Sequence, residues 1–133
     1  MVNRLALVAL ALGATACGGG ADGGAVQSGV TLLDVQVQVF TPHCALSGCH
    51  TGPGAPLGLD LSAGAAAGNI VGVASAESPA LMRIEPFDAV NSYLYMKVTA
   101  DPRILGDPMP LTGGPLSASD VQLIADWIGQ GAL

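Results

Sequence analysis

Aromatic side chains are scarce in this chain of 133 residues, which holds two Phe, two Tyr and one Trp. A folded part of about a hundred residues can just bury a core of its own. So few aromatic rings leave that core short of bulk, and a flat apolar prosthetic group would supply the missing interior. The scarcity therefore favours a single small domain built around a large cofactor.

Basic residues are also few, with four Lys and Arg against ten Asp and Glu, so that the formal net charge is −6. The four basic residues form no cluster, and phosphate neutralisation requires basic patches. We therefore expect no nucleic-acid partner. An acidic surface suits a basic or neutral partner protein, or it keeps an exported protein soluble.

The apolar run over residues 5–12 is too short to cross a membrane, because a transmembrane helix needs about twenty apolar residues. Arg4 precedes this run, and small residues follow it as far as Ala16. This arrangement is typical of an export signal. We therefore assign residues 1–16 to a signal peptide that is removed before Cys17.

The segment Ala14-Thr15-Ala16-Cys17 resembles a bacterial lipobox, in which the cysteine is acylated and becomes the new N-terminus. Plain secretion with cleavage nearby is the alternative. Residues 18–30 include six glycines and read as a flexible tether that spans roughly 20 Å. We expect residues 17–30 to join the domain to the bacterial envelope, at the outer membrane or the periplasmic face.

Both histidines and two of the three cysteines fall within the eight residues from His43 to His50. In the usual covalent haem signature, Cys-x-x-Cys-His, two thiols bond the haem vinyl groups and the imidazole binds iron. Cys44 and Cys49 are separated by four residues rather than two, and Gly48 allows the longer loop to bulge. The pattern predicts a haem c attached at both cysteines, with iron bound by His50.

Two other interpretations of this segment remain open. A disulfide between Cys44 and Cys49 would suit an exported protein, although it leaves His50 without a role. A zinc site would need four ligands, and the segment offers His43 and His50 beside the two cysteines. These donors form adjacent pairs, which are poorly arranged for a tetrahedron.

From Thr31 to Leu133 the chain resembles the small single-haem class I cytochrome c domains of bacterial envelope proteins, including the planctomycete type. The resemblance implies an all-α, cytochrome c-like fold over residues 31–133, with a few short helices and long loops around one covalent haem. The matching pieces are Phe40-Thr41-Pro42-His43-Cys44, Cys49-His50, Gly58-Leu59-Asp60-Leu61, Asn91-Ser92-Tyr93-Leu94, Asp107-Pro108-Met109-Pro110 and Trp127-Ile128-Gly129-Gln130-Gly131-Ala132.

The segment from Thr31 to Phe40 carries two conflicting signals. Its apolar residues alternate with polar ones, as in a strand. Thr31 followed by Asp34 forms a possible helix cap, and Pro42 would end the helix. The resemblance implies a helix, and we expect one.

Three further helices are expected between Pro-rich and Gly-rich loops. The first is a short alanine-rich helix over residues 62–67 that starts at Asp60 or Ser62. The second, over residues 93–98, begins at Asn91 or Ser92. The third begins with the capping pattern of Ser117, and its core stripe comprises Val121, Ile124, Ala125 and Ile128, widened by Leu123 and Trp127.

Met109 lies between two prolines in a loop, after the attachment motif and before the last helix. The rigid prolines would present its thioether in one direction. Met82 and Met96 look like core residues, and His43 is held close to the attached edge of the haem by its neighbour Cys44. Met109 is therefore the expected second axial ligand of the iron.

These features predict a protein that transfers single electrons between redox partner proteins and is not an enzyme, because His50 and Met109 leave no open position on iron. No small-molecule substrate is expected. One alternative is a sensor or enzyme subunit in which Met109 is displaced from iron. The other is a haem-free lipoprotein with a disulfide.

Overall fold

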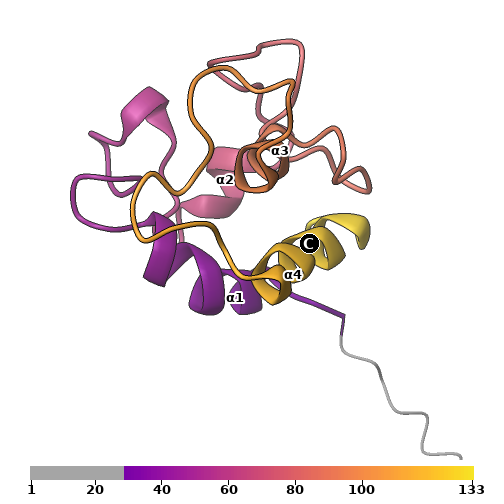
Figure 1. Ribbon diagram of the computed structural model, residues 1–133. Coiled ribbons are helices and arrows are strands. Elements are labelled where there is room, and N and C mark those ends of the chain that lie inside the picture. The colour runs from indigo at the N-terminus through magenta and orange to yellow at the C-terminus, as the bar shows by residue number, and fades with distance from the viewer. Residues whose placement is uncertain (1–28) are drawn as a thin grey trace, which may run out of the picture.

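The computed structural model of the protein describes residues 29–133 (Figure 1). This part of the chain contains short helices and three isolated bridges but no strand, which confirms the all-α prediction. The export signal, Cys17 and most of the Gly-rich tether lie outside the described residues. The helical elements are α1 (Leu32–Val35), η1 (Gln36–Cys44), η2 (Pro56–Gly58), α2 (Ala66–Ile70), α3 (Tyr93–Thr99) and α4 (Ala118–Gly129).

The first helix begins where the capping pattern predicted. The Asp34 backbone N–H donates to the Thr31 hydroxyl at 3.3 Å, and the Thr31 N–H donates to the Asp34 carboxylate at 2.8 Å. This reciprocal pair satisfies two N–H groups that the first turn of a helix leaves unpaired. After α1 the chain continues without a break as η1, a π-helix.

The expectation that Pro42 ends this helix is wrong, since Pro42 lies inside η1. In α geometry a proline ring presses on the carbonyl four residues back. The π-helix is wider, and its hydrogen bonds reach five residues back. At its end the Ala45 N–H donates to the Phe40 carbonyl at 2.7 Å, so the helical segment carries the chain past Pro42 to Cys44.

The alternating pattern in this segment separates two faces of a helix. Val35 and Val39 are fully buried, whereas Leu33 and Val37 are 69% and 62% exposed. Each pair is four residues apart and so shares one helix face. Gln36 is buried as well, and its side-chain amide donates to the Leu61 carbonyl at 3.0 Å.

Helix α4 packs against α1, and the two lie together below the loops in Figure 1. The predicted Ser117 cap is present, with its hydroxyl accepting from the Asp120 N–H at 3.1 Å. Trp127 is fully buried, and its ring meets Phe40 edge-to-face with centroids 6.5 Å apart. One aromatic pair therefore joins the N-terminal and C-terminal helices.

Helix α2 begins later than predicted, at Ala66 instead of just after Asp60 or Ser62. The Ser62 N–H donates to the Asp60 carboxylate at 2.9 Å, which forms a local turn. Gly64 follows in the left-handed region with φ +85°, so helical geometry cannot begin before it. The side chains of Asp60 and Ser62 bond each other and do not cap the helix.

Helix α3 begins after Ser92, as predicted, but the Ser92 side chain does not cap it. The Ser92 hydroxyl accepts from the Glu85 N–H at 2.8 Å and donates to the Asp88 carbonyl at 2.8 Å. It therefore ties the preceding loop together. Tyr93 and Met96 are both buried, so Met96 is a core residue, as predicted.

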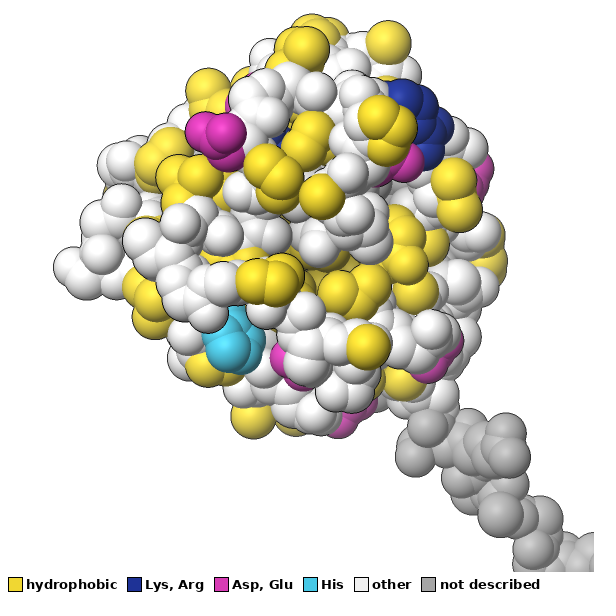
Figure 2. Space-filling model, viewed as in Figure 1, with side chains coloured by type: hydrophobic (Ala, Val, Ile, Leu, Met, Phe, Trp, Pro, Cys, Tyr) yellow, Lys and Arg dark blue, Asp and Glu magenta, His cyan; other side chains and the backbone are white. Residues whose placement is uncertain are grey.

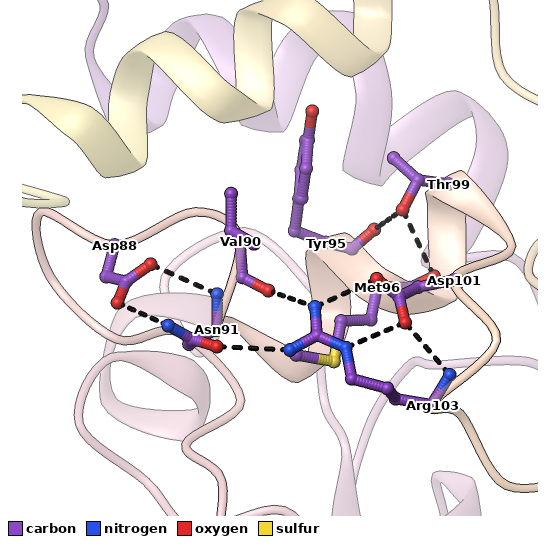
Figure 3. Close-up of polar contacts among 8 residues, drawn as sticks. All are labelled: Asp88, Val90, Asn91, Tyr95, Met96, Thr99, Asp101 and Arg103. Atoms are coloured by element: carbon purple, nitrogen blue, oxygen red, sulfur yellow. Dashed lines mark hydrogen bonds and ion pairs between the residues drawn. The ribbon is translucent and has the colours of Figure 1, made fainter.

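Arg103 joins the loop before α3 to the chain that follows it (Figure 3). Its guanidinium donates to the Val90 carbonyl at 2.9 Å, to the Asn91 side chain at 3.2 Å and to Asp101 at 2.9 Å. Asn91 in turn donates to Asp88 at 2.7 Å. The network sets the direction in which the chain leaves α3.

The ion pair between Arg103 and Asp101 predicts that the stability of the fold depends on pH. Hydrogen bonds from the Arg103 side chain and then its backbone lower the pKa of Asp101 from 3.8 to about 2. Because the unfolded chain binds this proton more readily, the contribution of Asp101 is complete above about pH 4 and is lost as the pH falls through about 2.

We expect Arg103→Gln to remove this dependence. The test is urea unfolding of wild type and variant at about pH 5 and about pH 2.5. The variant should lose less stability between the two values, and added salt should narrow the difference, since the pair lies at the surface. Equal losses in both proteins would contradict the prediction.

Candidate functional site

The segment from Cys44 to His50 forms a closed loop at the end of η1. The His50 N–H donates to the Cys44 carbonyl at 3.0 Å, and the Cys49 N–H donates to the Leu46 carbonyl at 2.9 Å. Gly48 turns the chain in the left-handed region with φ +79°, which glycine adopts at no steric cost. These bonds hold both cysteines and His50 in one compact turn despite the four-residue gap.

The thiols of Cys44 and Cys49 are both free and half-buried. The disulfide that the spacing left open is therefore not formed in this structure. Burial, and secondly the nearby Cys49, raise the pKa of the Cys44 thiol to about 11. Cys44 is accordingly a protonated thiol at neutral pH.

The His50 imidazole is half-buried, and its Nδ1 atom is buried without a hydrogen-bond partner. Burial lowers the pKa of His50, and the positive charges of Arg83 and Lys97 lower it further. Hydrogen bonding with the Leu59 backbone raises the pKa in part. The ring is therefore held neutral, which is the form that binds metals. An unpaired buried nitrogen costs about 1–3 kcal/mol, and a bound group that pairs with the ring would remove that cost.

His50 and Met109 line one central cavity, together with the side chain of Cys44. The space between its walls, with the open mouth and the solvent in it included, amounts to about 820 Å³. Most of its other lining residues are apolar, namely Phe40, Pro56, Leu57, Leu59, Leu61, Ala76, Leu94, Val98 and Ile124. In the face shown in Figure 2, apolar side chains gather across the middle and charged ones are few.

A second hollow, the rim pocket, adjoins the central cavity and shares with it Cys44, His50, Pro56 and Met109. Cys49 lines this pocket, as does His43. The structure therefore brings all four predicted haem residues of the described chain to two hollows with shared walls: Cys44, His50 and Met109 line both, and Cys49 lines the rim pocket. Chain segments some sixty positions apart meet there, since Met109 follows His50 by fifty-nine residues.

Met109 is the only methionine of the described residues that lines either hollow. Met96 is fully buried in α3, and Met82 is half-buried beside its bridge partner Ala74. His43 is exposed at the rim pocket. Of the rival distal ligands that the sequence offered, His43 alone borders the site.

Two basic residues complete the central cavity, and sequence reasoning assigned them no role. Arg83 donates to the Leu57 carbonyl at 2.8 Å, the Gly58 carbonyl at 3.2 Å and the Asn69 carbonyl at 2.9 Å, so it holds the loop around η2 against α2. Lys97 is buried and reaches the Met109 loop. One feature of the sequence could have indicated this role. Arg83 and Lys97 are single basic residues in a mainly apolar chain, and such residues are candidates for buried positions where they are paired.

The residues present fit a covalently attached haem. A covalently attached haem requires an apolar cavity, two thiols and a neutral imidazole. The central cavity provides the apolar lining with Cys44 and His50, and the rim pocket adds Cys49. Within residues 29–133 no three His, Cys, Asp or Glu side chains are grouped to hold a metal ion. A four-ligand zinc site would need such a group, whereas a haem iron would take one imidazole and one thioether from the chain.

Comparison with family models, with curated proteins and with solved structures found no match to this chain. In the part of the chain that the structure describes, no helix combines the length and the apolar character required to cross a bilayer.

Proposed function

We propose that this protein is a single-haem cytochrome c that transfers electrons between partner proteins. The observation that carries the proposal is the convergence of Cys44, Cys49, His50 and Met109 on the central cavity and the rim pocket, which share part of their lining. The first three residues are neighbours in sequence. Met109 is not, so its arrival at the same space is independent support for the assignment.

Each residue would have a defined part in holding the cofactor. The S–H groups of Cys44 and Cys49 would add across the two vinyl groups of haem, with two C–S bonds formed and no atom lost. His50 and Met109 would bind the iron. Haem supplies a metal that changes its charge by one electron, and the apolar lining keeps water from it, which tunes the reduction potential.

The arrangement of helices supports a cytochrome c-like fold as part of this proposal. The N-terminal and C-terminal helices pack together through Phe40 and Trp127. The attachment segment follows the first helix directly, and the Met109 loop precedes the last one. Both segments contribute lining residues to the hollows, the first through Cys44 and His50 and the second through Met109.

A visible absorption spectrum of protein from a host with haem maturation machinery tests this function. We expect the sharp bands of a reduced c-type haem, and no change when carbon monoxide is added to the reduced protein. A spectral change with carbon monoxide would favour the sensor or enzyme alternative. A protein without visible absorption would refute the haem proposal.

We further propose that Cys17, outside the described residues, is acylated and anchors the protein to the bacterial envelope. There its acidic surface would meet basic or neutral redox partners. Several acyl chains hold a protein stably where one does not, at about 0.8 kcal/mol per buried CH₂.

Cys17→Ser should therefore move the protein from the membrane fraction to the soluble fraction. Immunoblots of the two fractions after gentle lysis provide the measurement, and Ser28→Ala in the tether is the control that should stay with the membrane. A wild-type protein that is already soluble would contradict the lipobox assignment.

A further inference from the structure

Lys97 is the only lysine of the chain, and it is 8% exposed. Its ammonium group forms an ion pair with Glu77 at 2.8 Å. It also donates to the Leu105 carbonyl at 2.6 Å and to the Asp107 carbonyl at 3.1 Å. An ammonium group has three N–H donors, and here all three have a partner.

The other contacts of α3 reach the same loop. The Met109 N–H donates to the Lys97 carbonyl at 2.9 Å, and the Leu105 N–H donates to the Tyr93 hydroxyl at 2.9 Å. Tyr93 and Lys97 are four residues apart and therefore share one face of α3. Side-chain and backbone groups on that face thus hold the loop at Leu105, Asp107 and Met109.

This attachment matters because the loop has no regular structure of its own between α3 and α4. Few internal bonds restrain such a segment, so its position depends on what it is tied to. Lys97, Glu77 and Met109 all line the central cavity. A buried lysine loses its hydration, which is costly unless its ammonium group keeps its partners. The bonds of Lys97 therefore favour the one loop position in which all of them form.

We propose that Lys97, with Glu77 as its ion partner, is the positioning residue that holds the Met109 loop against α3. This role rests on the proposed function only in its consequence, which is that the clamp sets how firmly the Met109 thioether is presented to iron. Lys97 itself does not bind the cofactor in this proposal. It acts through the Leu105 and Asp107 carbonyls.

The direct test is hydrogen exchange of the Met109 and Leu105 amides in the full chain as purified. Lys97→Gln leaves two carbonyls and the Glu77 charge without their partner, so we expect exchange at both amides to be at least about tenfold faster than in wild type. Lys97→Arg restores the charge and the donors, and it should return most of the protection.

The matched control is Arg83→Gln, which removes the same charge from the same cavity but from the loop around η2. It should leave protection at Met109 and Leu105 within about twofold of wild type. Rates in Lys97→Gln that match wild type would overturn the proposal. Equal acceleration in both variants would overturn it as well, since any lost charge would then suffice.

Glu77→Gln provides a second measurement if Lys97→Gln does not fold. Because Lys97 is the only lysine, an amine-reactive acetylating reagent followed by peptide mass mapping reports the exposure of this one side chain. We expect labelling of Lys97 to be at least about fivefold faster in Glu77→Gln than in wild type. An unchanged rate would refute the role of the ion pair.

The haem-dependent consequence has its own measurement in the oxidised, haem-loaded protein. Lys97→Gln should weaken the red-region sulfur-to-iron band and increase carbon monoxide binding after reduction, whereas Arg83→Gln should retain the band. Loss of amide protection in a chain without a haem spectrum would sink the proposed function and leave the clamp standing. If Lys97→Gln has a haem spectrum, and both its sulfur-to-iron band and its amide protection are the same as in wild type, the clamp is refuted and the proposed function stands.

Discussion

Cys49→Ser is expected to abolish nearly all covalent haem, measured as haem stain on a denaturing gel and as intact mass. Cys49 directly precedes His50, and the turn that holds both is closed by the bond from the His50 N–H to the Cys44 carbonyl. Losing this attachment removes the bond that fixes the cofactor next to its axial imidazole. Cys44→Ser should be milder, because attachment through Cys49 still places iron at His50.

Cys17→Ser is the control for this prediction, since it removes a cysteine that is not expected to hold haem and should keep the full stain. The wild-type mass should exceed that of the polypeptide by one whole haem, because thiol addition releases no atoms. A wild-type mass equal to the bare polypeptide less a pair of hydrogens would show a disulfide. That result would sink the attachment proposal.

Met109→Ala is expected to eliminate the weak red-region sulfur-to-iron band of the oxidised protein while haem remains attached. A thioether ligand favours ferrous iron and raises the potential, so its loss should lower the reduction potential. The open position should also let the reduced protein bind carbon monoxide. Spectra, a redox titration and the denaturing gel measure these three effects on one sample.

Met82→Ala and Met96→Leu are the matched controls, because neither side chain lines the cavity or the rim pocket. Leucine conserves most of the volume of the buried Met96 and should cost less than about 1.5 kcal/mol. His43→Gln tests the one rival that borders the rim pocket. If the band survives in Met109→Ala and disappears in Met82→Ala or Met96→Leu, the distal assignment is wrong. It is also wrong if the wild type lacks the band and His43→Gln opens the reduced iron to carbon monoxide.

Local sequence signals located some ends of the helices and missed others. Thr31 and Ser117 cap α1 and α4 as their spacing to Asp34 and Asp120 indicated, because a cap involves groups only three residues apart. Pro42 misled because the π geometry of η1 is a property of the folded segment and has no signal in a pattern of apolar residues.

The strand-like pattern of the first helix also misled, because the pattern alone does not show which apolar residues are buried. Alternation of apolar and polar residues predicts a strand only if one face of the segment is buried. Here Val35 and Val39 enter the core while Leu33 and Val37 remain exposed. Which apolar residues are covered depends on α4, whose sequence begins some eighty residues later.

The sequence by itself determined the close grouping of Cys44, Cys49 and His50, because these residues are neighbours in the chain. The all-α class came from the resemblance to cytochrome c domains, since periodicity in the first segment favoured a strand. Only the tertiary structure decided that Met109 reaches the cavity while Met82 and Met96 do not. Only the structure shows that Arg83 holds the loop around η2 and that Lys97 holds the Met109 loop. The physical reason is that a cavity wall is made by segments distant in sequence, and their meeting depends on core packing and on buried hydrogen bonds between side chains and remote carbonyls.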